Sequence, residues 1–213
     1  YRDKIGGIFK TRALISRNVI TGNRAGSGGG VSFCQGTLRD NRITSNTATS
    51  DWDGGGGIAE CDGPVEDNTI AFNAAGEGGG LDRCQGPIRR NIIAHNRATG
   101  NGGGGLEDCD NLIEENEITS NTAIQGGGGI SNCDATIRNN TVTGNRAGTG
   151  GGINGSRGTI ERNTISRNVA YSRGGGLANC NGLVRNNIIA DNRVEPPGDR
   201  GGGLCYGHAT LEG

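Results

Sequence analysis

The sequence lacks what several large classes of protein depend on. Its 213 residues include no Met, one Trp, two His and only two lysines. No apolar run approaches the roughly 18 residues that a membrane-spanning helix needs. The charge is balanced, with 21 basic and 22 acidic residues, and this balance excludes the basic surface typical of proteins that bind nucleic acid or anionic membranes. We therefore expect no nucleic-acid partner and no insertion into a membrane.

Glycine and asparagine are abundant instead, and they recur with a regular period. The chain has 44 Gly and 24 Asn. An aliphatic residue follows each Gly run, and successive ones stand 23 to 27 positions apart. These residues are Ile8, Val31, Ile58, Leu81, Leu106, Ile130, Ile153, Leu177 and Leu204. Each repeat continues with a position that is Cys in six repeats, which we call the Cys slot, and then a second aliphatic residue. Two Asn positions follow, on either side of an Ile or Val, and in most repeats Ala comes after them.

This repeat predicts a stack of short parallel strands. The segments between Gly and Asn are too short for helices, and a helical period is absent. One repeat has too few apolar positions to bury a core, so each must pack on its neighbours. We predict an all-β fold, a single parallel β-helix of about nine coils with a period of about 24 residues. The first aliphatic residue and the Cys slot are three positions apart, so in one straight strand they would face opposite sides. Both face inward only if the chain bends between them.

Two ladders of Asn follow from the stacking. Equivalent residues in parallel coils lie about 4.8 Å apart. Asn suits the corners because its amide can bond the copies above and below and because it tolerates left-handed backbone. The first ladder is Asn18, Asn41, Asn68, Asn91, Asn116, Asn140, Asn163 and Asn187. The second is Asn23, Asn46, Asn73, Asn96, Asn121, Asn145, Asn168 and Asn192.

Cysteines form a further ladder. Six of the seven share one slot, and Cys205 lies two residues before it. The six are Cys34, Cys61, Cys84, Cys109, Cys133 and Cys180. Stacking holds their Cβ atoms about 4.8 Å apart, whereas a disulfide needs about 3.8 Å. We expect buried free thiols, with disulfides between some adjacent coils as the alternative, and no metal site, because a single row of thiols lacks tetrahedral geometry.

The residue after the second aliphatic position alternates in charge. From Arg39 to Arg185 the row reads Arg, Glu, Arg, Glu, Arg, Glu, Arg. Each charge is predicted to lie between two opposite ones, which fixes the register of the stack. This face therefore does not suit a polyanion.

Two elements of the repeat resemble a known family. Gly127–Ile130, which reads Gly-Gly-Gly-Ile, and Ile118–Asn121, which reads Ile-x-x-Asn, are similar to repeats of right-handed parallel β-helices. Such repeats occur in polymorphic outer-membrane proteins and in pectate-lyase-like carbohydrate proteins. The resemblance covers nearly the whole chain and implies a right-handed coil and an extracellular or cell-surface location. It implies little about activity, because this architecture serves lyases, hydrolases, epimerases, adhesins and inert stalks.

The same resemblance draws attention to one acidic cluster. Pectate-lyase-like enzymes place acidic residues and a basic residue on one strand ladder, where calcium and the basic group handle a uronic acid. The nearest equivalent is Asp82, Arg83, Glu107 and Asp108, directly before two Cys slots. In a polysaccharide lyase or glycoside hydrolase these would be the catalytic residues, with calcium as cofactor. The alternative is that they are solvated strand residues, with Arg83 neutralising its neighbours.

Other candidate sites are few. An insertion carries Asp51, Trp52 and Asp53, and an exposed Trp between two Asp is a candidate for stacking on a sugar ring. His95 and His208 are the only histidines and lie over four coils apart, so no Ser-His-Asp or Cys-His arrangement follows.

These observations favour a non-enzymatic extracellular module: a rigid stalk, a surface-protein repeat or a fibre subunit. Residues 1–213 form one β-helix domain in this interpretation. It has no caps, so it belongs to a larger protein or joins end to end with copies of itself. Its partners would be itself and a polysaccharide, and it would need no metal or other cofactor. The alternative is a carbohydrate-active enzyme that uses the acidic residues on adjacent coils.

Overall fold

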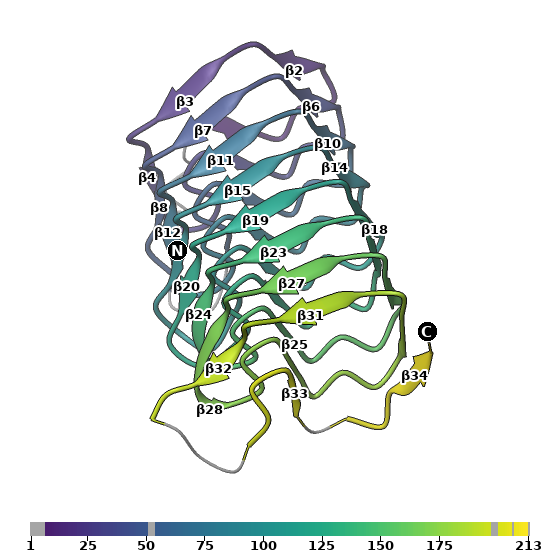
Figure 1. Ribbon diagram of the computed structural model, residues 1–213. Helices are drawn as coiled ribbons and strands as arrows, with labels where there is room; N and C mark the ends of the chain where they lie inside the picture. The colour runs from purple at the N-terminus through teal and green to yellow at the C-terminus, as the bar shows by residue number, and fades with distance from the viewer. Residues whose placement is uncertain (1–6, 51–53, 197–199, 206, 213) are drawn as a thin grey trace.

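The structure is a computed structural model that describes residues 7–50, 54–196, 200–205 and 207–212. In these ranges the chain forms short strands and no helix. The strands make four parallel sheets, two of nine strands and two of eight, and each coil adds one strand to each sheet until the last, partial coil. The coils lie one above another (Figure 1). The predicted parallel β-helix of about nine coils is therefore confirmed.

The strands follow the same order in every coil. The first sheet contains β1 (Ile8–Phe9), β5 (Val31–Ser32), β9 (Ile58–Ala59), β13 (Leu81–Asp82), β17 (Leu106–Glu107), β21 (Ile130–Ser131), β25 (Ile153–Asn154), β29 (Leu177–Ala178) and β33 (Leu204–Cys205). The second contains β2 (Ile15–Ser16), β6 (Leu38–Arg39), β10 (Val65–Glu66), β14 (Ile88–Arg89), β18 (Leu112–Glu114), β22 (Thr136–Arg138), β26 (Ile160–Glu161), β30 (Leu183–Arg185) and β34 (Thr210–Glu212).

Two eight-stranded sheets complete each turn. The third contains β3 (Val19–Thr21), β7 (Arg42–Thr44), β11 (Thr69–Ala71), β15 (Ile92–Ala94), β19 (Glu117–Thr119), β23 (Thr141–Thr143), β27 (Thr164–Ser166) and β31 (Ile188–Ala190). The fourth contains β4 (Arg24–Ala25), β8 (Thr47–Ala48), β12 (Ala74–Ala75), β16 (Arg97–Ala98), β20 (Thr122–Ala123), β24 (Arg146–Thr149), β28 (Val169–Arg173) and β32 (Arg193–Val194).

The core is one continuous column of aliphatic side chains and thiols. In a central coil Leu106, Cys109, Ile113 and Ile118 are all fully buried. Each buried aliphatic side chain contributes about 1.5–3 kcal/mol relative to an exposed one. No single coil buries enough to be stable, so stability comes from stacking.

Bends with left-handed backbone allow this column to form. Arg83 and Asp108, both at φ 48°, lie between the first aliphatic residue and the Cys of their coils. The predicted bend is therefore present, and both flanking side chains reach the core. Similar left-handed residues precede the Asn positions, such as Arg90 and His95. We expected the ladder Asn themselves to take this conformation, and that was wrong: the residue before each one makes the turn, and the Asn side chain points inward.

The two Asn ladders bond each coil to its neighbours. Asn96 Nδ2 donates to Asn121 Oδ1 at 3.0 Å and to the Ile70 carbonyl at 2.9 Å. The Asn96 backbone N–H donates to the same Asn121 oxygen at 2.9 Å. One fully buried amide thus joins three consecutive coils, and the pattern recurs along both ladders.

The alternating charges stand in register, but only some touch. Glu114 lies between Arg89 and Arg138, with N···O distances of 3.7 and 2.6 Å. Arg185 lies 2.8 Å from Glu161. These pairs are partly exposed, so each contributes about 0–1 kcal/mol.

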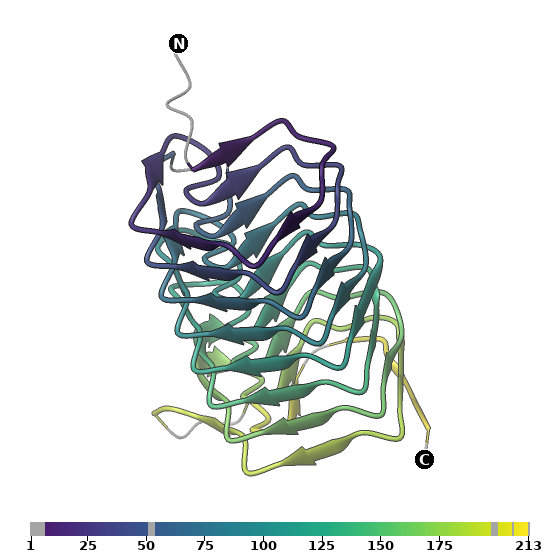
Figure 2. The same cartoon turned by 90° about the horizontal axis from the view of Figure 1, so that it is seen from above.

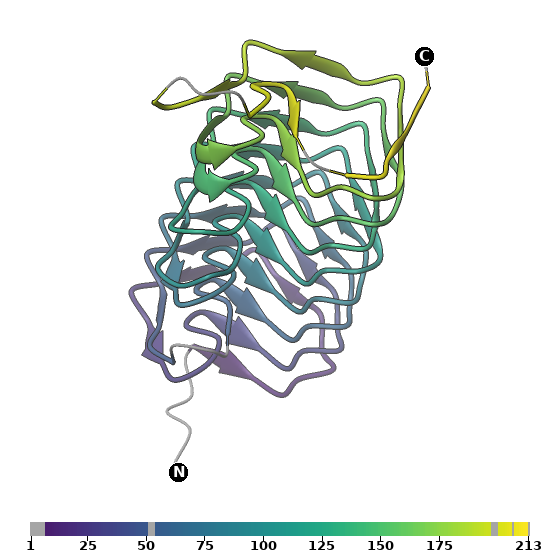
Figure 3. The ribbon, with the colours of Figure 1, turned by 90° about the horizontal axis from the view of Figure 1, so that it is seen from below.

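Gly-rich connections from the fourth sheet to the first cover the outside of the first sheet. Figures 2 and 3, from opposite sides, show this curl of chain repeated from coil to coil. Gly78, at φ +46°, packs so closely that a Cβ there would lie 2.5 Å from Asp82 Cβ. The outward-facing row of the first sheet is therefore buried rather than solvated. Its members at most 4% exposed are Ser32, Ala59, Asp82, Glu107, Ser131 and Ala178.

Candidate functional site

Asp82 and Glu107 are register partners on β13 and β17. Strand alternation turns Leu81 and Leu106 into the core and these two carboxyl groups outward. The Gly-rich connections cover them, and their side chains are 1% and 4% exposed. Their interpretation as solvated strand residues is therefore wrong. It failed because the strand pattern does not reveal the loop that covers them.

Burial changes the acidity of both carboxyl groups. It raises the pKa of Asp82 to about 7, opposed by Arg83, whose Nη2 lies 3.1 Å from Asp82 Oδ2. It raises the pKa of Glu107 to about 8, and the charge of Asp108 adds to the rise. Asn132 Nδ2 donates a 2.8 Å hydrogen bond to Glu107 Oε1. Both carboxyl groups therefore keep their protons to a higher pH than exposed carboxyl groups do.

Arg83 and Asp108 extend the cluster of Asp82 and Glu107 to the surface. Both lie at the bend after their strands and are partly exposed. Burial and the charge of Asp110 raise the pKa of Asp108, while Arg83 lowers it. Arg83 Nη2 also lies 3.8 Å from Glu60 Oε1. The four residues singled out in the sequence are therefore neighbours, but two are under the surface and two are on it.

A shallow groove runs beside them, along the bend between the first and second sheets. We call it the bend groove. Its two rows of side chains flank the Cys slot, one residue before it and one after it. The first row is Lys10, Phe33, Glu60, Arg83 and Asp108. The second is Arg12, Gln35, Asp62, Gln85 and Asp110, with Thr11 between the rows.

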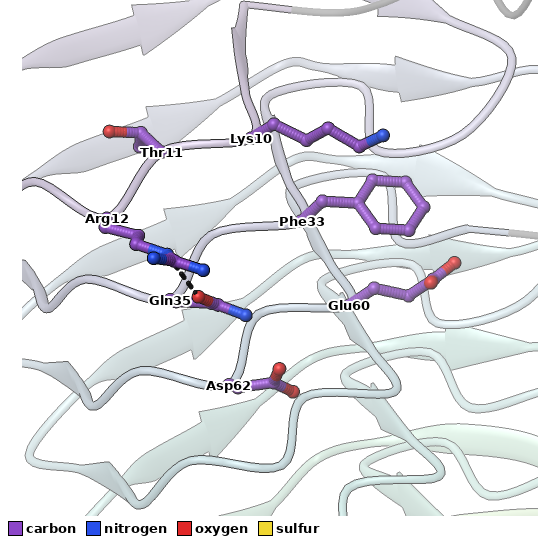
Figure 4. A pocket seen from close by; sticks show the side chains of 7 residues that line it. All are labelled: Lys10, Thr11, Arg12, Phe33, Gln35, Glu60 and Asp62. Carbon is purple, nitrogen blue, oxygen red and sulfur yellow. Dashed lines mark hydrogen bonds between the residues drawn. The ribbon is translucent and has the colours of Figure 1, made fainter.

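The groove has two overlapping parts. One, of about 320 Å³, extends from Lys10 and Arg12 to Asp62. The other, of about 480 Å³, continues from Phe33 to Asp110. Figure 4 shows Lys10, Phe33 and Glu60 one above another on one side of the first part, with Arg12, Gln35 and Asp62 on the other.

Several contacts order the first part of the groove. Arg12 Nε donates a 2.8 Å hydrogen bond to Gln35 Oε1. The Phe9 and Phe33 rings meet edge to face with centroids 5.5 Å apart. Lys10 Nζ lies 5.1 Å from the Phe9 centroid and 6.0 Å from that of Phe33. The side chains that line this end are held by specific contacts.

The thiols do not contribute to this surface. The six in-register cysteines are fully buried and free, while Cys205 is free and partly exposed. Burial raises the pKa of Cys180 to about 12 and also raises that of Cys133. Cys133 and Cys180 are therefore protonated, whereas a hydrogen bond with Cys61 lowers the pKa of Cys34 to about 7. Full burial shields all six ladder thiols from reactants, so they are poor nucleophiles.

One comparison with known proteins identifies the family. A family model for the right-handed beta helix region matches residues 105–211. The chain belongs to the right-handed β-helix family. The resemblance noted in the repeats is thereby confirmed. Neither the curated proteins nor the solved structures contain a match to the chain.

The remaining candidate sites of this β-helix are quickly placed. Asp51, Trp52 and Asp53 lie outside the described residues. In the described ranges, no three His, Cys, Asp or Glu side chains converge as a metal site requires. The part of the chain that the structure describes also has no helix with the length and apolar character needed to cross a bilayer.

The bend groove was missed in the sequence, although a signal for it exists. Its two rows occupy the positions immediately before and after the Cys slot in the first five coils. Aligning the repeats on that slot would have placed Lys10, Glu60 and Asp108 in one row. The alignment would not have shown that these rows border a hollow, because that depends on the bend angle.

Proposed function

We propose that this β-helix is a non-catalytic extracellular or cell-surface module, used as a rigid stalk, a surface-protein repeat or a fibre subunit. The two buried Asn ladders carry the proposal. They run through eight successive coils and bond each coil to the next at 3.0–3.2 Å. Nine strands in the first sheet make eight steps of about 4.8 Å, a rod about 38 Å long.

The burial of the acidic residues supports a non-catalytic role. A catalytic acid or base must come within hydrogen-bond reach of its substrate. Asp82 and Glu107 are under the Gly-rich connections, and glycines such as Gly78 leave no room between loop and strand. The proposal includes no cofactor, no nucleic-acid partner and no membrane insertion.

Electron microscopy of the purified chain over a range of concentrations tests the proposal. A stalk or repeat module gives short rods of constant length. A fibre subunit, which binds further copies of itself end to end, gives filaments that lengthen with concentration. Globular particles of variable shape would contradict both forms. Detection of the native protein on intact cells of its source would test the proposed location.

A second candidate function, polysaccharide cleavage or binding, has one observation in its favour. Carboxyl groups with raised pKa beside an Arg are typical of active sites, and Asp82, Glu107 and Arg83 fit that description. The test is a panel of polysaccharides, with and without calcium, against the native chain and a variant with Asp82→Ala and Glu107→Ala. The first proposal expects no activity from either protein. Activity that the double substitution removes would replace the first proposal with the second.

A further inference from the structure

The bend groove changes its chemistry from one end to the other. Lys10 and Arg12 make the first coil cationic, Phe33 and Gln35 make the second neutral, and the third is anionic. The acidic side chains of the third coil are Glu60 and Asp62. The fourth coil adds Arg83 and Gln85 and the fifth adds Asp108 and Asp110, so beyond Phe33 the groove carries four carboxylates and one guanidinium. A uniform strip of one charge would not show this order.

The charges in the first part of the groove are available to a ligand. Among the described residues, Lys10 and Arg12 form no ion pair with a carboxylate, and Asp62 forms none with a basic side chain. In the part of the chain that the structure describes, the ion pair of Glu60 is the 3.8 Å approach to Arg83. On the second sheet, by contrast, Glu114 has Arg89 on one side and Arg138 on the other. Charges on the second sheet are thus neutralised by ion pairs, whereas most charges in the first part of the bend groove have no ion-pair partner among the described residues.

The distances suit an extended chain. Cationic and anionic ends lie two coils apart, which is about 10 Å at about 4.8 Å per coil. An extended peptide in the polyproline II conformation rises about 3.1 Å per residue with three residues per turn, so side chains three residues apart face the same side and lie about 9 Å apart. Phe33, 36% exposed, offers an apolar contact midway, and Gln35 offers an amide that can bond a backbone.

We propose that the bend groove binds an extended peptide segment that carries an anionic and a cationic group about three residues apart. The anionic group pairs with Lys10 and Arg12, and the cationic group pairs with Glu60 and Asp62. Any ligand with charges of one sign meets like charges at one end of the groove, which disfavours polyuronates and polycations alike. This site is additional to the proposed structural role and does not depend on it.

Calorimetry with short peptides tests the proposal. The probe is acetyl-Glu-Ala-Tyr-Lys-amide, whose blocked ends leave only the two side-chain charges. Three further peptides replace both charged residues with Glu, with Lys or with Gln. We expect the mixed-charge peptide to bind at least fivefold more tightly than the other three, and its binding to weaken as salt increases.

A charge reversal in the protein makes the test specific. With Lys10→Glu and Arg12→Glu every charged side chain that lines the first part of the groove is acidic, so the preference should move to the doubly Lys peptide. The matched control carries Arg42→Glu and Arg97→Glu, which are exposed on the third and fourth sheets, and should retain the original preference. Thermal unfolding of each variant verifies that it is folded.

Three outcomes would overturn the proposal. The first is equal affinity for the neutral and mixed-charge peptides, or no binding of either at millimolar concentration. The second is a Lys10 and Arg12 reversal that leaves the preference unchanged in a folded protein. The third is tighter binding of polygalacturonate or polylysine than of the mixed-charge peptide, which would assign the groove to a polyelectrolyte.

Discussion

Asp82 and Glu107 stand opposite each other on adjacent strands, and both carboxyl groups are buried beneath Gly-rich chain. Both side chains keep their protons to a higher pH than carboxyl groups in water do. In this position they resemble the small residues that occupy the same row in other coils, such as Ser32, Ala59 and Ser131. Their main effect on the protein is therefore expected in its stability and its dependence on pH.

The stability of the β-helix should fall as pH rises. The pKa values of Asp82 and Glu107 in the folded state are raised to about 7 and about 8, so the unfolded chain ionises first. The stabilisation is complete below about pH 4 and is lost as pH passes through about 7 to 8. The loss is up to about 4–5 kcal/mol for each group. Urea unfolding between pH 4 and 9 measures it.

Neutral substitutions should remove this dependence. Asp82→Asn and Glu107→Gln together keep the shape of the protonated groups, so the slope between pH 4 and 8 should flatten. Glu117→Gln, an exposed substitution on β19, is the control and should leave the slope as it is. An unchanged slope in the double variant would show that other groups cause it.

Equivalent glycines in two coils should differ in their tolerance of alanine. A Cβ at Gly105 would lie 2.5 Å from the Gly129 carbonyl oxygen, whereas at Gly203 the nearest heavy atom is Ile189 Cγ2 at 3.6 Å. We expect Gly105→Ala to cost about 2–4 kcal/mol and Gly203→Ala less than about 0.5 kcal/mol. Similar losses from both, measured by urea unfolding, would mean that contact between coils does not explain the Gly runs.

Loss of a central ladder amide should be more costly than loss of an outer one. Asn121 is fully buried and bonds the Ile93 carbonyl, Asn145 and Asn96. Asn121→Ala leaves buried partners unsatisfied, at about 1–3 kcal/mol each. Asn192 is partly exposed, so Asn192→Ala should cost less than half as much. Chemical denaturation of the two variants makes the comparison, and equal costs would contradict the ladder as the source of stability.

The thiols should divide into one accessible group and six protected groups. Only Cys205 is partly exposed, while the ladder cysteines are fully buried. Mass spectrometry after brief treatment with iodoacetamide should therefore find one label on the native chain and seven on the unfolded chain. With Cys205→Ser the native chain should take none. Rapid labelling of any ladder cysteine would show that the coils open on that timescale.

The fold could be predicted because each repeat has the same pattern of residues. The interval from Leu81 to Leu106 fixes which residues stack, and the parity between Leu81 and Cys84 requires the bend that Arg83 makes. The site was harder to predict. Whether Asp82 faces water depends on the path of a connection rich in Gly, and Gly restricts the backbone too little for that path to be deduced. The ladder Asn were assigned the left-handed turn for a similar reason, since composition alone does not say which of two adjacent residues makes it.

The Asn ladders also give the molecule a direction. From the second coil onward every ladder oxygen accepts from the coil before it, as Asn121 accepts from Asn96 and Asn145 accepts from Asn121. A neighbour turned by a two-fold rotation would present oxygen to oxygen or donor to donor, so it cannot extend the pattern. Whole coils that run in the same direction can extend the pattern, wherever in the stack they are inserted. The length of such a rod is therefore free to vary by duplication, while its polarity is not.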